Sequence, residues 1–176
     1  MITVNNLQFE TFIPEAEVKQ KVKEIAAKIN RDYEGKCPVL VAILNGSFIF
    51  AADLVRELTI EHEVHFAKVA SYSGTESTGV VKKLIGVDIP LEGRDVIIVE
   101  DIVDTGVTMS HLLDWLKAQA VKSVEICSLI LKPEKLKVKL DVKYFGLEIP
   151  DVFVLGYGLD YDNKGRQFKD IYKVKL

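Results

Sequence analysis

The chain has 176 residues, of which 48% are hydrophobic and 28% charged, a composition typical of one soluble globular domain. Its 23 basic and 26 acidic residues give a net charge of −3, which disfavours non-specific binding to nucleic-acid phosphates. The two cysteines, Cys37 and Cys127, form neither a disulfide framework nor a thiolate zinc motif, so a reducing, cytoplasmic location is expected.

Patterns typical of helices and strands alternate along most of the chain. After Pro14, apolar residues recur at three- and four-residue spacing and predict a helix that ends near Arg31. The unbroken apolar run 39–44 predicts a strand covered on both faces, and a second helical pattern follows over 48–58. Further along, the sequence predicts strands over 63–71, 79–89, 95–99 and 124–131, a helix around 112–116, and short strands over 142–145, 152–155 and 171–174.

This alternation predicts an α/β fold in which an open, mostly parallel, twisted sheet is flanked by helices on both faces. Ligands of such folds bind at the carboxyl ends of the strands. The chain has no internal repeat and no Gly-, Ser- or Pro-rich linker, so residues 1–176 are expected to form a single domain. Within it we expect a core of about residues 15–132 and a small hood lobe, about residues 1–14 and 133–176, that roofs the site.

Membrane segments and dinucleotide or metal motifs are not predicted. The longest uncharged run, residues 37–52, falls short of the roughly 20 apolar residues of a membrane span, and the first ten residues lack signal-peptide features. Gly156-Tyr157-Gly158 lacks the third glycine of a dinucleotide fingerprint. The three histidines, His62, His65 and His111, are too scattered to suggest a metal site.

The segment 96–109 carries the strongest chemical signal. Three acids, Glu100, Asp101 and Asp104, lie at or just past the end of a buried strand. Because an unpaired buried carboxylate costs several kcal/mol, roughly, Glu100 and Asp101 need cationic or hydroxyl partners. Read alone, residues 104–106 fit a turn into a helix N-cap equally well.

The loop after these acids supplies the complementary half of a site. Thr105, Gly106 and Thr108 offer backbone N–H groups and hydroxyls at a helix start, where the helix dipole favours an anion. Carboxylates that accept sugar hydroxyls or bind near Mg²⁺, beside a loop that holds a phosphate, predict a site for a phosphorylated ribose.

Residues 96–108, with four apolar residues, two acids, two apolar residues and then D-T-G-x-T, resemble the phosphoribosyl-pyrophosphate (PRPP) binding motif of type I phosphoribosyltransferases. Three further segments resemble the hypoxanthine-guanine branch of that family. They are residues 44–46, similar to its pyrophosphate loop, residues 71–72 with 78–79, similar to its catalytic loop, and residues 128–132 with 153–161, similar to its purine site. The resemblance covers about residues 39–166.

The resemblance implies a type I phosphoribosyltransferase fold and an Mg²⁺-dependent purine salvage reaction. The enzyme would transfer the 5-phosphoribosyl group from PRPP to N9 of hypoxanthine or guanine, giving IMP or GMP and pyrophosphate. Asp104 would be the catalytic acid/base at purine N7. By the same resemblance, the residues that contact PRPP and its phosphates would be Asn45, Gly46, Tyr72, Glu100, Asp101, Asp104, Thr105, Gly106, Val107, Thr108 and Arg166. The residues that contact the purine would be Lys132, Phe153, Val154 and Asp160, and those that bind the metal would be Glu100, Asp101 and Asp160.

The family's purine site implies that Lys132 donates to the 6-oxo group, so adenine would be a poor substrate, and that Phe153 stacks on the base. The sequence departs from the family pattern at three positions. Asn45 and Gly165 stand where the family commonly has Lys and an aromatic residue, and Val107 stands where some relatives have Lys. At positions 45 and 107 the backbone would therefore carry the phosphate contacts.

Two alternatives stay open. One is a xanthine- or guanine-preferring phosphoribosyltransferase, because main-chain carbonyls are expected to read the purine 2-position. The other is an RNA-binding regulator with this fold, which the net charge of −3 and the lack of a Lys/Arg cluster disfavour. We therefore expect no nucleic-acid and no membrane partner, and the resemblance implies a homo-dimer or homo-tetramer.

Overall fold

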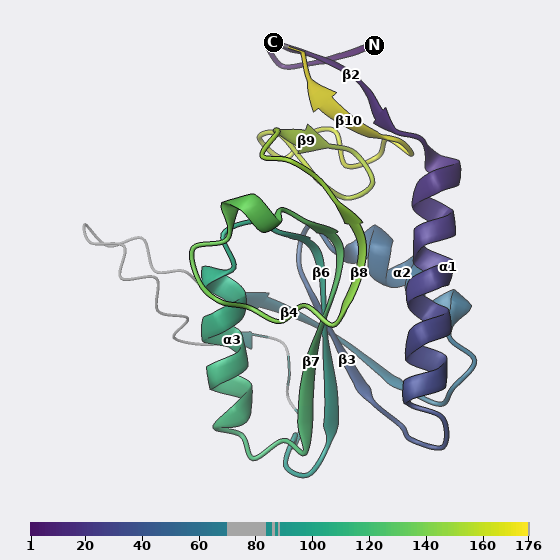
Figure 1. Cartoon of the computed structure of the whole chain (residues 1–176), viewed down its shortest axis with the longest axis vertical. Helices are drawn as coiled ribbons and strands as arrows, with labels where there is room; N and C mark the ends of the chain where they lie inside the picture. Colours follow the sequence, from purple (N-terminus) through teal and green to yellow (C-terminus); the bar gives the residue numbers. More distant parts are fainter. Residues whose placement is uncertain (70–83, 86, 88, 176) are drawn as a thin grey trace.

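The computed structural model describes residues 1–69, 84–85, 87 and 89–175, and its strands form two sheets (Figure 1). The larger sheet has the order β5-β4-β3-β6-β7-β8. Five of its strands are parallel to their neighbours, and only β5 is antiparallel. These strands are β3 (Val39–Ile43), β4 (Glu63–Val69), β5 (Leu84–Ile85), β6 (Asp95–Val103), β7 (Ser123–Leu131) and β8 (Tyr144–Glu148).

Helices cover both faces of this sheet, which confirms the predicted α/β layering. Helices α1 (Glu15–Asp32) and α2 (Phe48–Glu57) pack on one face and α3 (Val107–Lys117) on the other (Figure 1). In β3, Leu40 and Ala42 join the core under α1 and α2, whereas Val39 and Val41 join the core under α3. A strand buried on both faces must be apolar throughout, which explains the unbroken run at 39–44.

The smaller sheet joins the two ends of the chain in the order β1-β2-β10-β9. Its strands, all antiparallel to their neighbours, are β1 (Ile2–Val4), β2 (Leu7–Ile13), β9 (Val154–Leu155) and β10 (Ile171–Val174). Val4, Phe9 and Leu155 form a separate small core there. In Figure 1 this sheet lies at the end of the molecule that carries both termini, beyond the ends of β6 and β7.

The structure differs from the sequence-based expectation in several elements, among them β1 and β2, which were not predicted as strands. Strand β8, a short run within the residues assigned to the hood, extends the larger sheet, because Tyr144 and Leu147 bury their side chains against the α1 side of the core. Strand β6 continues to Val103, beyond the expected end at residue 99, because β7 pairs with it over its full length. Glu100 and Asp101 therefore lie within a central strand.

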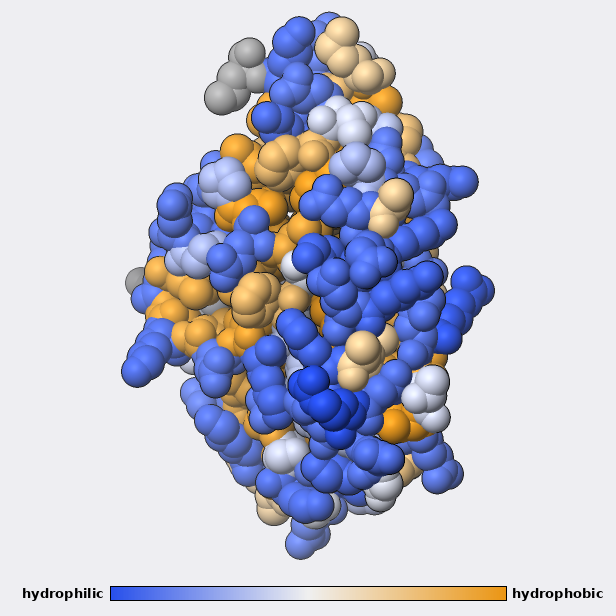
Figure 2. All heavy atoms as spheres, turned by 45° about the vertical axis from the view of Figure 1, so that its right-hand side comes forward, coloured by the Kyte–Doolittle hydropathy of each residue, from blue (hydrophilic) through white to orange (hydrophobic). Residues whose placement is uncertain are grey.

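Among the described residues, no helix is both long and apolar enough to span a membrane. On the face that Figure 2 presents, most of the surface is hydrophilic, and apolar side chains gather toward the upper half of the molecule. The predicted catalytic loop, residues 71–79 with Tyr72, lies outside the described residues.

Candidate active site

The connection between β6 and α3 shapes a small pocket at the end of the larger sheet. Gly106 precedes α3 with a left-handed φ of 76°. A Cβ there would lie 3.0 Å from Leu136 Cδ2 and 3.2 Å from Val138 Cγ2, so glycine suits both the backbone and the close packing. The pocket has a volume of about 100 Å³ and is lined by residues 102–106, 108 and 109. It lies at the positive end of the α3 dipole, a position that favours an anion.

Glu100, which is half-buried, and Asp101, which is buried, form an acidic pair just before this pocket. The Asp101 backbone N–H donates to Glu100 Oε1 at 3.2 Å, and the Ile102 N–H donates to Asp101 Oδ1 at 2.9 Å. Burial, with the Asp101 carboxyl beside it, raises the pKa of Glu100 well above its usual value. Burial also raises the pKa of Asp101, although Glu100 and the positive charge of Arg166 oppose that rise. The sequence predicted cationic or hydroxyl partners for these acids; among the described residues the hydrogen-bond donors to them are backbone N–H groups, and the positive charge of Arg166 acts on Asp101.

The loop between β3 and α2 lies directly against this acidic pair. Its Leu44–Asn45 peptide bond is cis, and Ser47 Oγ donates to the Ile43 carbonyl at 2.6 Å. A Cβ on Gly46 would overlap the Asp101 carboxylate, so only glycine lets the loop approach so closely. Asn45 is exposed beside it. The predicted pyrophosphate loop and the acids of β6 thus meet at one place.

Arg166 connects the same loop to the hood. Its Nη1 donates to the Gly158 carbonyl at 2.7 Å, and its Nη2 lies 2.7 Å from Asp160 Oδ1. Gly158 in turn touches the Gly46 carbonyl, and a Cβ on Gly158 would overlap that oxygen. Asp160 also accepts the Asn163 backbone N–H at 2.7 Å. These contacts place the predicted Arg166 and Asp160 on the hood side of the 44–47 loop.

Asp104 is one member of a closed ring of four charged side chains. Its carboxylate lies 3.4 Å from Lys132 Nζ and 3.1 Å from Lys135 Nζ. The Asp151 carboxylate lies 3.3 Å and 3.0 Å from the same two nitrogens. Lys132 has only 6% of its side chain exposed, so the two carboxylates balance a cation that burial would otherwise destabilise.

One oxygen of Asp104, Oδ1, lies 3.4 Å from Lys132 Nζ without accepting a hydrogen bond from it. Oδ1 is buried and, among the described residues, accepts no hydrogen bond, because its approach to Lys132 Nζ has poor hydrogen-bond geometry. A buried acceptor without a donor costs free energy unless a ligand supplies one. Asp104 thus presents an acceptor to whatever binds beside it.

Aromatic side chains of the hood follow Asp151 along the chain. Phe153 is 43% exposed, with its ring centroid 6.1 Å from that of Phe9 and 5.6 Å from that of Tyr161, the latter edge-on. The next residue, Val154, is buried in β9. A half-open aromatic ring two residues from an aspartate that binds Lys132 is a suitable neighbour for a planar ligand.

The structure brings seven of the sequence-predicted residues into two connected groups. One joins the acidic pair of β6 to Gly46, Arg166 and Asp160, and the other joins Asp104 to Lys132. Among the described residues, no group of three or more acids, His or Cys could hold a metal, so Glu100, Asp101 and Asp160 do not form one ligand set. Lys135 and Asp151 were missed, because a lysine and an aspartate in polar loops carry no pattern that distinguishes them from solvated residues.

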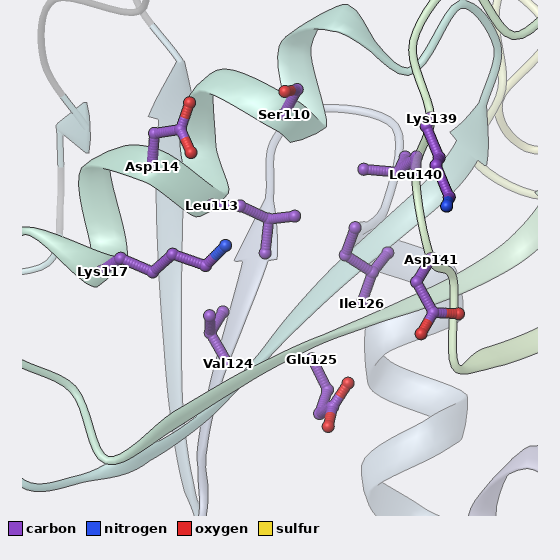
Figure 3. Close-up of a pocket in the computed structure, with 10 residues that line it drawn as sticks. All are labelled: Ser110, Leu113, Asp114, Lys117, Val124, Glu125, Ile126, Lys139, Leu140 and Asp141. Atoms are coloured by element: carbon purple, nitrogen blue, oxygen red, sulfur yellow. The ribbon is translucent and has the colours of Figure 1, made fainter.

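A second pocket, of about 320 Å³, contains none of the predicted site residues. Figure 3 shows that its lining comes from α3, β7 and residues 139–141. Side chains of both charges, including Asp114, Lys117 and Lys139, surround the apolar Leu113, Ile126 and Leu140 (Figure 3). It lies apart from the charge ring and the acidic pair.

Comparison with known proteins gives matches over most of the chain. Residues 13–162 match the family model described as the phosphoribosyl transferase domain. The chain is 44% identical over 170 residues to the hypoxanthine phosphoribosyltransferase of Escherichia coli, covering 95% of this chain and 96% of the relative. A crystal structure of a hypoxanthine-guanine phosphoribosyltransferase from Bacillus anthracis superposes with a TM-score of 0.87 at 39% identity, over 97% of this chain and 100% of that one. A hypoxanthine phosphoribosyltransferase from Staphylococcus aureus gives a TM-score of 0.87 at 39% identity, over 96% and 92% of the two chains.

The chain therefore belongs to the phosphoribosyltransferase family, and its fold is the type I phosphoribosyltransferase fold expected from the sequence. The relatives match it across nearly their whole length, and the match spans both sheets.

Proposed function

We propose that this protein is a purine salvage enzyme that transfers the 5-phosphoribosyl group of PRPP to N9 of hypoxanthine or guanine, releasing pyrophosphate. The names of relatives 37–44% identical to it support this substrate class. The single observation that carries the proposal is the position of Asp104. It stands between a pocket suited to a phosphate and a buried lysine suited to a 6-oxo purine.

The ribose 5-phosphate would bind in the pocket at the start of α3. Backbone N–H groups of residues 105–108 and the hydroxyls of Thr105 and Thr108 are the donors available there. Val107 contributes only its backbone. Helix N-termini of this kind bind phosphates without a cationic side chain.

Pyrophosphate would bind on the other side of the acidic pair, between the Asn45–Gly46 backbone and Arg166. The guanidinium of Arg166 has a planar array of donors that matches phosphate oxygens, although two of its nitrogens now contact Gly158 and Asp160. Binding would exchange the Asp160 contact for a phosphate contact.

Mg²⁺ fits this donor set. Mg²⁺ in proteins commonly takes one or two carboxylates and completes its shell with water and substrate phosphates, so a three-acid cage is not needed. Glu100 and Asp101, whose pKa values are raised by burial, gain a compensating charge if the cation binds beside them. Asp160 would act through the water shell. The cation would supply neutralisation of the phosphate charges.

The purine would lie between the charge ring and Phe153. Lys132 would donate to the 6-oxo group, and the main chain at Val154 and Asp160 would bind the base edge. The Asp104 carboxylate, whose Oδ1 accepts no hydrogen bond among the described residues, would accept the purine N7–H and take up its proton as N9 attacks. As the bond to pyrophosphate breaks, positive charge develops on the ribose. Glu100 and Asp101, when ionised, would stabilise that charge.

Turnover with each base tests the proposal directly. We expect hypoxanthine and guanine to be converted with PRPP and Mg²⁺, with adenine a poor substrate. In Asp104→Asn we expect kcat to fall by about 100-fold or more while the Kd for PRPP changes little, because the lost function is proton transfer.

Three results would contradict the assignments. Preference for xanthine would favour the alternative enzyme, and salt-sensitive RNA binding without turnover would favour the regulator. Turnover of Asp104→Asn within threefold of the parent would remove Asp104 from its acid/base role.

A further inference from the structure

A tight turn in the hood has backbone geometry that its sequence does not favour. Gly156 and Leu159 exchange two backbone hydrogen bonds of 3.1 Å, and the residues between them, Tyr157 and Gly158, have φ values of 51° and 100°. Positive φ at both central positions defines a type I′ turn, for which Asn-Gly is the usual sequence. A tyrosine disfavours left-handed backbone, so another interaction must hold it there.

That interaction is a hydrogen bond to α2. The Tyr157 hydroxyl donates to Asp53 Oδ2 at 2.6 Å, and the tyrosine is only 3% exposed. Burial, together with Asp53, raises the pKa of the Tyr157 hydroxyl, which therefore stays protonated as the donor. The buried ring and the charge-assisted bond offset the unfavourable backbone.

The turn that Tyr157 holds contacts the proposed phosphate site twice. Gly158 lies against the Gly46 carbonyl so closely that a Cβ would overlap it. The Gly158 carbonyl accepts Arg166 Nη1, and the Gly158 N–H donates to the Arg166 carbonyl at 3.0 Å. The position of the turn therefore fixes both the backbone and the guanidinium of Arg166.

Asp53, the acceptor of this hydrogen bond, lies in α2, the helix that directly follows the 44–47 loop. Helix α2 begins at Phe48, directly after that loop, and the Ala51 N–H donates to the Ser47 carbonyl at 2.8 Å. Asp53 is therefore held in a constant position relative to Gly46. The hydrogen bond from Tyr157 to Asp53 therefore sets the position of the 156–159 turn relative to the 44–47 loop, which the turn contacts.

We propose that Tyr157 and Asp53 are positioning residues for pyrophosphate. Their hydrogen bond holds the 156–159 turn against the 44–47 loop and so aims Arg166 at the phosphates. Neither side chain touches the substrate. This inference rests on the proposed function, because Arg166, Asn45 and Gly46 are taken there to bind pyrophosphate.

The test compares two tyrosines that make the same bond in different places. Tyr157→Phe removes the hydroxyl bonded to Asp53. Tyr144→Phe is the matched control, because Tyr144 is 1% exposed and donates to Asp32 Oδ2 at 2.9 Å, at the amino end of β8. Both changes remove one buried tyrosine–aspartate bond and are expected to lower the unfolding temperature similarly.

Only Tyr157→Phe should weaken phosphate binding. We expect the KM for PRPP and the Kd for magnesium pyrophosphate, measured by calorimetry, to rise about 3- to 10-fold, which is the effect of losing one hydrogen bond. The KM for hypoxanthine should stay within about twofold of the parent. Tyr144→Phe should leave all three constants unchanged.

Variants at Asp53 separate the effect of its hydrogen bond from the effect of its side-chain volume. Asp53→Ala should raise the Kd for magnesium pyrophosphate as Tyr157→Phe does, and the double variant should add little to either, because both remove the same bond. Asp53→Asn keeps an oxygen acceptor for the tyrosine hydroxyl and should remain within about twofold of the parent.

Unchanged pyrophosphate affinity in Tyr157→Phe, or an equal loss in Tyr144→Phe, overturns the inference. A parent that binds no pyrophosphate overturns it as well. A parent that binds pyrophosphate but converts no purine with PRPP overturns the proposed function instead, and the calorimetric comparison then still decides the positioning role.

Discussion

Lys132 illustrates how single residues at this site depend on their partners. A lysine with 6% of its side chain exposed is stable only beside compensating charge, which Asp104 and Asp151 provide at 3.4 and 3.3 Å. Lys135 binds the same two carboxylates but has 34% of its side chain exposed. The two lysines therefore bind the same two carboxylates while differing in burial, and only the buried one is proposed to contact the base.

Replacing each lysine by alanine should separate these roles. Lys132→Ala should lower kcat/KM for hypoxanthine by about 100-fold or more and that for adenine far less, because only the 6-oxo purine loses a donor. Lys135→Ala removes a neighbour of the same ring but no proposed purine contact, so it should lower both values in similar proportion. Steady-state kinetics with the two bases measures the ratio. An unchanged ratio in Lys132→Ala would mean that another group selects the base.

At the scale of elements, the junction between β6 and α3 carries most of the proposed chemistry. The strand supplies the acidic pair, the turn supplies Asp104, and the helix start supplies N–H groups for a phosphate. Gly106 is the residue on which this junction depends, because it has a positive φ and its Cα packs closely against Leu136 and Val138. Leu136 and Val138, which follow η1 (Pro133–Lys135), therefore pack against Gly106 and support the loop that is proposed to bind phosphate.

Gly106→Ala should disturb the loop through both effects. We expect it to lower the free energy of unfolding by about 2–4 kcal/mol, from strained φ and from crowding, and to raise the KM for PRPP. Gly93→Ala is the matched control, because Gly93 has φ 68° and no atom within 4 Å of its Cβ position. That variant should lose only the φ contribution, about 1–2 kcal/mol, with unchanged kinetics. Equal losses in the two variants would show that the packing on Leu136 and Val138 is unimportant.

The whole molecule places an acidic pair in the centre of its larger sheet, and its stability should depend on pH as a result. The folded protein binds the Glu100 proton more tightly than the unfolded chain, because the pKa of Glu100 is raised well above 4.5. This contribution to stability is complete below about pH 4.5 and is lost as the pH rises through the folded-state value. Asp101, whose pKa is also raised, acts in the same direction.

Glu100→Gln should remove much of this dependence. Without ligands, we expect the variant to be more stable than the parent by about 1–3 kcal/mol at pH 8 and equal to it near pH 4. Urea unfolding across this range measures the difference, and Glu92→Gln, at an exposed position, is the control. If the free energies of unfolding of the parent and of Glu100→Gln differ by the same amount at all pH values, ionisation of Glu100 does not destabilise the folded protein.

The sequence by itself determined the layering and predicted where the site lies. Apolar runs such as 39–44 must be buried on both faces, and helical spacing after Pro14 and over 48–58 leaves one face for the sheet, so local patterns suffice to predict an α/β core. The order of acids, glycine and threonine over 100–108 likewise predicts a phosphate loop, because the chemistry that such a loop needs is local to one strand–turn–helix unit.

Only the tertiary structure decided which distant residues meet. Asp151 with Lys132, Tyr157 with Asp53, and β8 with β7 join segments between 13 and 104 residues apart, and the chain between them carries no pattern that reports the contact. The extent of β6 was decided in the same way, since two polar acids end an apolar run locally but remain in the strand when β7 supplies hydrogen bonds. Backbone pairing and charge pairing across the fold are cooperative, so they become definite only when all the elements are packed together.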